Sequence, residues 1–163
     1  MIEMKVFGLA LDEDSQVPVL ILKDSEEKIV LPIWIGAMEA MAISLALNEV
    51  SLPRPMTHDL LLNAISQMGG KVVAVAVVDL REGTYYAEIE VDQNGTPRRI
   101  DSRPSDAIAL AIRAQAPILV SKKVVEQMAS EQGGAKPVIK TEEAEKWNEI
   151  LEKFSLDDSK YKM

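Results

Sequence analysis

Six residues near the middle of the chain carry a high density of side chains that could do chemistry. Residues 101–106 read Asp-Ser-Arg-Pro-Ser-Asp and lead directly into an apolar segment. Pro104 suits the first turn of a helix, because a proline lacks the N–H that is unpaired there. Ser102 or Arg103 would then be the N-cap, and Asp106 would lie in the first turn, where free N–H groups attract oxygen and anions. The segment therefore predicts a strand end, a polar turn and a helix start.

Two further polar clusters are expected at the starts of helices. One ends in Glu39, which follows a strand-like run and a glycine. The other holds Arg54, the single histidine of the chain, His58, and Asp59. Helices on one side of a sheet bring their N-termini together, and such termini bind anions. We therefore expect the three clusters to lie around one concave surface.

The residue types favour carboxylate chemistry at such a surface. With one histidine and no cysteine, a single chain cannot form a histidine-rich or cysteine metal site. The sequence contains no phosphate-binding glycine loop, no HExxH motif and no GxSxG elbow. Carboxylates could instead bind Mg²⁺ or Mn²⁺ together with water and substrate phosphates, and such a site could hydrolyse phosphodiesters. The candidate metal ligands are Glu39, Asp59, Asp101 and Asp106.

Each candidate residue also has an ordinary structural explanation. Acids at helix starts commonly offset the helix dipole, a lone histidine is more often structural than catalytic, and Arg103 could pair with Asp101 or Asp106 to hold the turn. Taken together, the clusters favour a site, because no other part of the chain is equipped for chemistry. The catalytic candidates are His58, Asp59, Asp101 and Asp106, and the substrate-binding candidates are Arg54, Ser102, Arg103 and Ser105.

Composition predicts one domain with a real core. The chain has 163 residues, of which 47% are hydrophobic and only 4% aromatic, so aliphatic side chains and methionine must fill the core. No apolar run approaches the ~20 residues of a membrane span, and the N-terminus lacks the pattern of a signal peptide. Together with the absence of cysteine, these features predict a cytoplasmic protein without a membrane segment.

The net charge of −8 argues against generic nucleic-acid binding, which rewards clustered lysine and arginine. The charge is unevenly distributed, however. Residues 93–123 hold six basic and two acidic side chains, a local charge of +4. This segment favours a phosphate-bearing partner, although an uneven surface charge is the simpler explanation.

Periodicity and turn residues predict an α+β fold: a mixed or mostly antiparallel sheet with helices packed on it. A helix over residues 58–68 should be capped by Thr57, and Asn94-Gly95 should form a hairpin turn. The expected strands are residues 2–11, 17–23, 28–35, 71–80, 84–92, 97–101 and 117–120. The other expected helices are residues 36–50, 104–115 and 122–130.

The C-terminal part of the chain is expected to form a separate element. Residues 1–132 form the domain, residues 133–140 a linker, and residues 141–163 an amphipathic helix and tail. Trp147, Ile150, Leu151 and Phe154 make one apolar stripe, which must dock on its own core or on a neighbouring subunit. We therefore expect a homodimer or a higher oligomer.

The three clusters, in this order, resemble those of the bifunctional nuclease domain family, over roughly residues 1–132. The composition suits a bacterial, thermophilic member. The likeness implies a cytoplasmic α+β protein, with DNase and RNase activity attributed to some relatives. Some members continue into a UvrB/UvrC-type interaction motif, which the helix bearing Trp147 does not resemble. The matching residues are Leu31-Pro32-Ile33-Trp34-Ile35-Gly36 with Glu39-Ala40, Arg54-Pro55-Met56-Thr57-His58-Asp59-Leu60, and residues 101–111.

Two functions remain open from the sequence. The first is a metal-assisted nuclease that acts on single-stranded or unstructured nucleic acid. The second is a non-catalytic regulatory module whose helix N-termini capture a small anion or an acidic group of a partner. The acidic total favours the second function, whereas the basic segment and the family resemblance favour the first.

Overall fold

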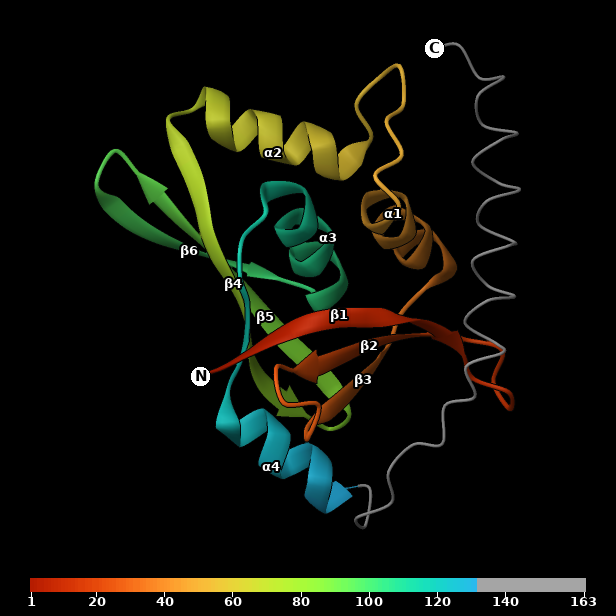
Figure 1. Ribbon diagram of the computed structural model, residues 1–163. Coiled ribbons are helices and arrows are strands. Elements are labelled where there is room, and N and C mark those ends of the chain that lie inside the picture. The colour runs from red at the N-terminus through yellow and green to blue at the C-terminus, as the bar shows by residue number, and fades with distance from the viewer. Residues whose placement is uncertain (132–163) are drawn as a thin grey trace.

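One seven-stranded sheet runs through residues 1–131, the part of the chain that the computed structural model describes (Figure 1). Its strands are β1 (Ile2–Leu11), β2 (Pro18–Asp24), β3 (Val30–Trp34), β4 (Gly70–Arg81), β5 (Thr84–Gln93), β6 (Thr96–Ser102) and β7 (Ile118–Val120). The helices of the same part are α1 (Ala37–Leu47), α2 (Thr57–Gln67), α3 (Pro104–Ala114) and α4 (Lys122–Glu131). The expected linker and C-terminal helix lie outside the described residues.

The strand order is β3-β2-β1-β7-β4-β5-β6, and β4 with β7 is the parallel pair in a sheet that is otherwise antiparallel. The predicted α+β class, with a mixed and mostly antiparallel sheet, is therefore confirmed. The alternation of buried and more exposed side chains is clearest in β5, where Ala87, Ile89 and Val91 are buried and face one side. The predicted hairpin between β5 and β6 is also confirmed: Asn94 and Gly95 both have positive φ values, of 52° and 83°.

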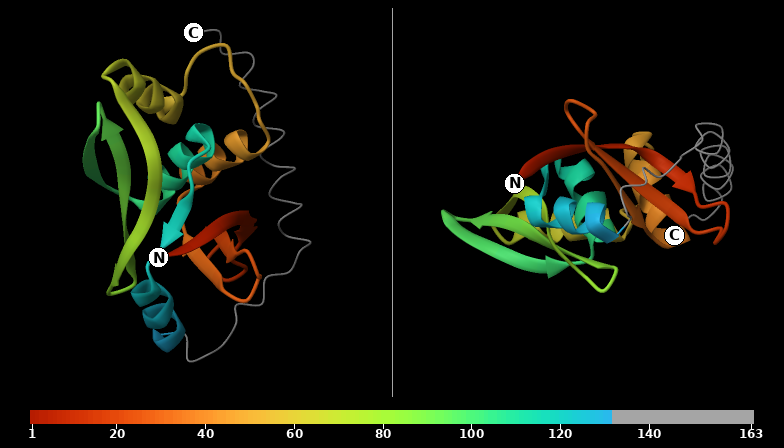
Figure 2. Two further views of the ribbon diagram at one scale, coloured as in Figure 1. Left: turned by 60° about the vertical axis from the view of Figure 1, so that its left-hand side comes forward. Right: turned by 90° about the horizontal axis from the view of Figure 1, so that it is seen from below.

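Helix α3 lies at the centre of the molecule. Seven of its eleven residues are buried, and it packs against α1, α2, β4 and β5. Figure 2 shows why: the sheet bends into two parts, β1–β3 and β4–β6, and α3 lies in the angle between them. Ala107, Ala109 and Ala111 allow close approach, while Ile108 and Leu110 fill the core with no exposed surface.

Two expected helix boundaries were wrong. The helix predicted over residues 36–50 ends at Leu47, because the side chain of Asn48 donates to the carbonyl oxygen of Ser44 and Glu49 has a left-handed φ of 53°. Thr57 is not the cap of α2. The N-cap is Met56, whose N–H donates to the carboxylate of Asp59, three residues on.

The helices of the described residues include none that is long and apolar enough to cross a bilayer. The helices cover the sheet instead. Val124 of α4, for example, has no exposed surface and packs into the main core.

Candidate functional site

Four polar side chains from three helix N-termini form one connected cluster. His58, in the first turn of α2, places Nε2 3.0 Å from Oδ1 of Asp106. Arg103, the N-cap of α3, donates from Nε to the other oxygen of Asp106 at 2.7 Å. The same guanidinium donates from Nη1 to Oε1 of Glu39, in the first turn of α1, at 2.9 Å. We call Glu39, His58, Arg103 and Asp106 the polar cluster.

Burial differs sharply between members of the polar cluster. The side chain of His58 is 12% exposed and that of Asp106 is 28% exposed, whereas that of Arg103 is 64% exposed. The imidazole is therefore held against the protein while the guanidinium faces solvent. A guanidinium has five N–H donors, so Arg103 retains donors for an external oxyanion beyond those bound to Asp106 and Glu39.

The contacts set the charges of the polar cluster. Burial alone raises the pKa of the Asp106 carboxyl, but the hydrogen bonds from Arg103 and His58 outweigh it, and the pKa lies below its ordinary value of 3.8. The hydrogen bonds to Asp106 and Glu39 raise the pKa of Arg103. Because an anionic carboxylate can only accept, His58 must donate from Nε2. The Nδ1 atom of the neutral ring then carries the lone pair.

Gly36 leaves room for the carboxylate of Glu39. A Cβ atom at position 36 would overlap Oε2 of Glu39, so a larger residue there would push the carboxylate aside. Gly36 is also the N-cap of α1, and a negative charge near this end of the helix is favourable. Gly36, the glycine of the predicted cluster that ends in Glu39, therefore has a direct role in placing that carboxylate beside Arg103.

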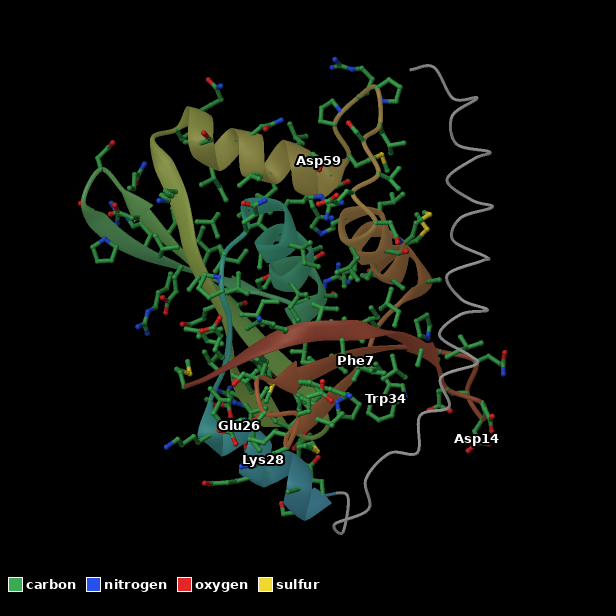
Figure 3. The ribbon with its side chains drawn as sticks, viewed as in Figure 1. Phe7, Asp14, Glu26, Lys28, Trp34 and Asp59 are labelled. Carbon is green, nitrogen blue, oxygen red and sulfur yellow. The ribbon has the colours of Figure 1, made fainter. Side chains whose placement is uncertain are left out.

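A second ion pair positions the helix that carries the histidine. Arg113, on α3 and only 9% exposed, donates from Nε to Oδ1 of Asp59 at 2.8 Å. Its other two nitrogens donate to the carbonyl oxygens of Ala109 and Ala42, at 2.8 and 3.0 Å. The second oxygen of Asp59 accepts the N–H of Met56 at 2.9 Å. Asp59 thereby holds the first turn of α2 against α1 and α3 (Figure 3).

The structure places the remaining predicted site residues around the polar cluster rather than in it. Arg54 lines a separate hollow of about 430 Å³, which it shares with Asp59 and Arg113. Ser102 donates to the carbonyl oxygen of the next residue at 2.9 Å, and Ser105 is buried at 6% exposure. Asp101 pairs with Glu88 in the β5–β6 register and is exposed.

A groove of about 680 Å³ opens beside the polar cluster. One wall is α2 and the other is the inner face of β5 and β6, and His58, Arg103 and Asp106 lie at its end. Thr57, Thr84, Asp101 and Ser102 also line it. The largely apolar residues of the lining include Leu61, Ile65, Ile89 and Ile100, together with Tyr85 and Tyr86.

The donor arrangement does not fit the predicted metal site. Among residues 1–131, no group of three or more histidine, aspartate or glutamate side chains is arranged to hold a metal ion. Arg103 bridges two of the four candidate ligands, Glu39 and Asp106, and Arg113 binds a third, Asp59. A guanidinium thus already balances the carboxylates that the sequence offered as ligands.

The basic segment of residues 93–123 does not form a basic surface, because acids from other segments pair with most of it. Lys123 lies 2.7 Å from Asp79, and holds the pKa of that carboxyl down at about 2, together with Arg81. Arg99 lies 3.7 Å from Glu88 and 3.8 Å from Glu90. Arg103 and Arg113 are paired as described above. In the described residues, Arg98 and Lys122 are the members of the segment without a salt bridge.

Three residues that contribute to the site or to its groove were not predicted from the sequence. The sequence indicated Arg113 only through its charge. It lies seven positions after Asp106, two turns later on the same helix face, and this spacing could have indicated a partner for the cluster that contains Asp59. Leu61 and Ile100 carry no local signal, because an apolar residue that faces a groove cannot be distinguished in sequence from one that faces a core.

Comparison with known proteins matches residues 20–132 to the bifunctional nuclease domain. An uncharacterized protein of Mycobacterium tuberculosis is 38% identical over 163 residues, covering 97% of this chain and 98% of that protein. Bifunctional nuclease 1 of Arabidopsis thaliana is 29% identical over 109 residues, covering 64% of this chain and 34% of that protein. Bifunctional nuclease 2 of the same plant is 31% identical over 97 residues, covering 58% of this chain and 30% of that protein.

Proposed function

Because the chain belongs to the bifunctional nuclease domain family, we propose that it hydrolyses phosphodiester bonds of DNA or RNA at the polar cluster. The observation that carries the proposal is the contact between His58 and Asp106 beside the exposed guanidinium of Arg103. An oriented histidine can move a proton, and an exposed arginine can hold phosphate oxygens. The plant relatives named as bifunctional nucleases support the same activity, at a distance.

In this proposal the histidine transfers the proton of the attacking water. The water oxygen forms a bond to phosphorus, and its proton passes to Nδ1 of His58. Asp106 stabilises the resulting imidazolium through the contact at Nε2. The bond from phosphorus to the leaving oxygen breaks, and that oxygen takes the proton from His58. Arg103 binds the phosphate oxygens as negative charge develops on them.

Divalent-metal assistance was predicted from the carboxylates and stays a prediction. The described donors do not assemble a metal site, so no step above depends on Mg²⁺ or Mn²⁺. An assay with EDTA, and with each metal added back, measures the dependence directly. Full activity in EDTA would contradict metal assistance, and loss that either metal restores would support it.

One observation favours the non-catalytic alternative, an anion- or partner-binding module. The basic residues of the segment 93–123 are mostly paired with acids, so this segment offers little attraction to a polyanion. In that case the polar cluster would bind a single anionic group at Arg103 without cleaving it. Such a module would bind phosphate-bearing ligands equally well with or without His58.

A nuclease assay with matched variants decides between the two functions. Wild type, His58→Asn and Asp92→Asn, each purified in the same way, would be incubated with circular single-stranded DNA and with RNA. Asp92, at the far end of β5, provides a control carboxylate change. Cleavage by wild type and Asp92→Asn but not by His58→Asn is expected. Equal cleavage by all three proteins would indicate a contaminant and contradict the proposal.

We also propose that copies of the chain associate. Phe7 of β1 and Trp34 of β3 are 55% and 46% exposed, and such aromatic surface is typical of interfaces (Figure 3). The apolar stripe that first suggested an oligomer lies outside the described residues. Light scattering should give at least twice the mass of one chain at micromolar concentration. The mass of a single chain would reject association.

A further inference from the structure

We propose that the groove beside the polar cluster binds one unstacked nucleobase, so that the nucleic acid must be single-stranded next to the bond that is cut. The inference rests on the proposed function, because it names the substrate form of the same site.

The walls present large aliphatic side chains to open space. Leu61 and Ile65, four residues apart on α2, lie on one face of that helix and line the groove. Across the groove, Ile100 of β6 pairs in register with Ile89 of β5 on the inner face of the sheet. Leu61 is 38% exposed and Ile100 is 44% exposed. Apolar surface left open on both sides of a groove favours a ligand that has an apolar part.

The end of the groove requires a different kind of group. The exposed guanidinium of Arg103 lies there, next to His58. A ligand that satisfies both parts has a flat apolar portion joined to an anionic portion, which describes a nucleotide unit. The volume of about 680 Å³ lies within the range of small-ligand sites. Thr57 and Thr84 line the same groove, and Thr57, in the first turn of α2, offers a hydroxyl type that could meet a polar edge of a base.

Base pairing would block this mode of binding. A base inside a duplex has both faces stacked and its hydrogen-bonding edge occupied, so it offers no apolar face to Leu61 and Ile100. Unstacking a base has a free-energy cost, and a strand that is already unstacked avoids that cost. The groove therefore selects single-stranded segments through its shape and not through its charge.

The test measures binding separately from cleavage. The full chain would be titrated against three fluorescein-labelled phosphorothioate probes: a short single strand, the same strand with one abasic position, and the duplex. Anisotropy should give about tenfold tighter binding to the intact single strand than to the abasic strand or the duplex, the scale expected for one apolar group in a pocket. Equal affinity for the intact and abasic strands would overturn the proposal.

Matched variants locate the effect in the groove. Leu61→Gln should reduce the affinity for the intact strand to that for the abasic strand. Leu60→Gln is the control, because Leu60 is the adjacent residue of α2, is 59% exposed and lies off the groove. Ile100→Thr, on the edge strand β6, tests the opposite wall independently if Leu61→Gln does not fold. A loss of preference in Leu60→Gln as well would contradict the assignment.

The remaining outcomes separate this inference from the proposed function. Base-dependent binding without any cleavage by wild type would contradict the nuclease and support the groove. Cleavage of single strand and duplex at equal rates would support the nuclease and overturn the groove. A change in mass between wild type and Leu61→Gln by light scattering would make this face an interface between copies, and would also overturn it.

Discussion

Helices α2 and α3 bring the two halves of the His58–Asp106 pair together, yet they are embedded very differently. Helix α3 has seven buried residues and lies between the two parts of the sheet. Helix α2 has no buried residue. Asp106 therefore belongs to the most enclosed helix of the described residues, and His58 to a helix that rests on the surface.

A helix with few buried residues can still orient a side chain when specific contacts hold one of its turns. Apolar packing fixes α3, whereas α2 packs only the partly buried Leu62 and Ile65 against the core and is also held by specific contacts at its first turn. The bond between Arg113 and Asp59 is one of these, and it originates from α3 itself. The deeply buried helix α3 thus also positions the first turn of the more exposed helix α2.

The largest effect is expected from substitutions that remove the catalytic side chain of either helix without disturbing the packing of that helix. His58→Asn and Asp106→Asn should each reduce kcat by about 10²–10⁴-fold, the range for loss of general acid–base catalysis. The double variant should lose no more than the worse single variant, because the two residues act as a unit. Initial rates and melting temperatures on the same preparations test this. Additive losses would show that the pair does not act together.

The second-largest effect is expected when a buried leucine of α3 and an exposed leucine of α2 are each shortened to alanine. Leu110→Ala on α3 should lower the free energy of unfolding by about 2–5 kcal/mol, because Leu110 has no exposed surface. Leu60→Ala on α2 should change it by less than about 0.5 kcal/mol. Urea denaturation measures both. Similar losses at the two positions would contradict the exposed placement of Leu60.

A smaller effect is expected from the ion pair that joins the helices. Arg113→Met should cost about 1–3 kcal/mol, because the carbonyl oxygens of Ala42 and Ala109 lose their donor, while the half-exposed carboxylate of Asp59 can turn to water. Arg113→Lys should recover little of this, since lysine cannot donate in three directions at once from a planar fork.

The readout for Arg113→Met can be specific to α2. Hydrogen exchange should increase in α2 more than in α3, and activity should fall through the displacement of His58. Because the chain has one histidine, a single imidazole signal in the NMR spectrum reports this displacement. An unchanged imidazole signal with unchanged exchange in α2 would remove Arg113 from any positioning role.

The smallest expected effect is the pH dependence of stability that Asp106 contributes. Its pKa in the folded protein is lower than the ordinary value of 3.8, so its contacts stabilise the fold fully above that value. The contribution is lost as the pH falls through the lower, folded pKa. The free energy of unfolding of Asp106→Asn should therefore depend less on pH below about 4 than that of wild type. Parallel curves for the two proteins would contradict this linkage.

Most of the fold could be predicted because its signals are local. The strand at residues 2–11, the hairpin at Asn94-Gly95 and the helix opened by Pro104 were all expected from adjacent residues. The ends of α1 and α2 were missed, because they depend on side chains reaching back to the backbone from Asn48 and Asp59. Such contacts compete with propensity and are not visible in a periodic pattern.

The sequence predicted which residues belong to the candidate site better than it predicted which of them form ion pairs. The sequence indicated Glu39, His58, Arg103 and Asp106, because all four lie at helix starts. It could not show that Arg103 would bridge two carboxylates or that Arg113 would bind Asp59. Those pairings depend on how three helices meet, which is set by long-range packing.

The pairing of the basic segment has a consequence for how binding should respond to ionic strength. A protein that neutralises many phosphates releases many condensed counterions, and its affinity falls steeply as salt is added. Here the exposed guanidinium at the groove belongs to Arg103, and the nearby Arg113 is already bound to Asp59. One phosphate contact corresponds to a slope of about −0.7 in a plot of log affinity against log salt for a single strand. Between about 50 and 200 mM salt the affinity should therefore fall only about 2–3-fold, whereas a protein that contacts six to ten phosphates loses about 10³–10⁵-fold.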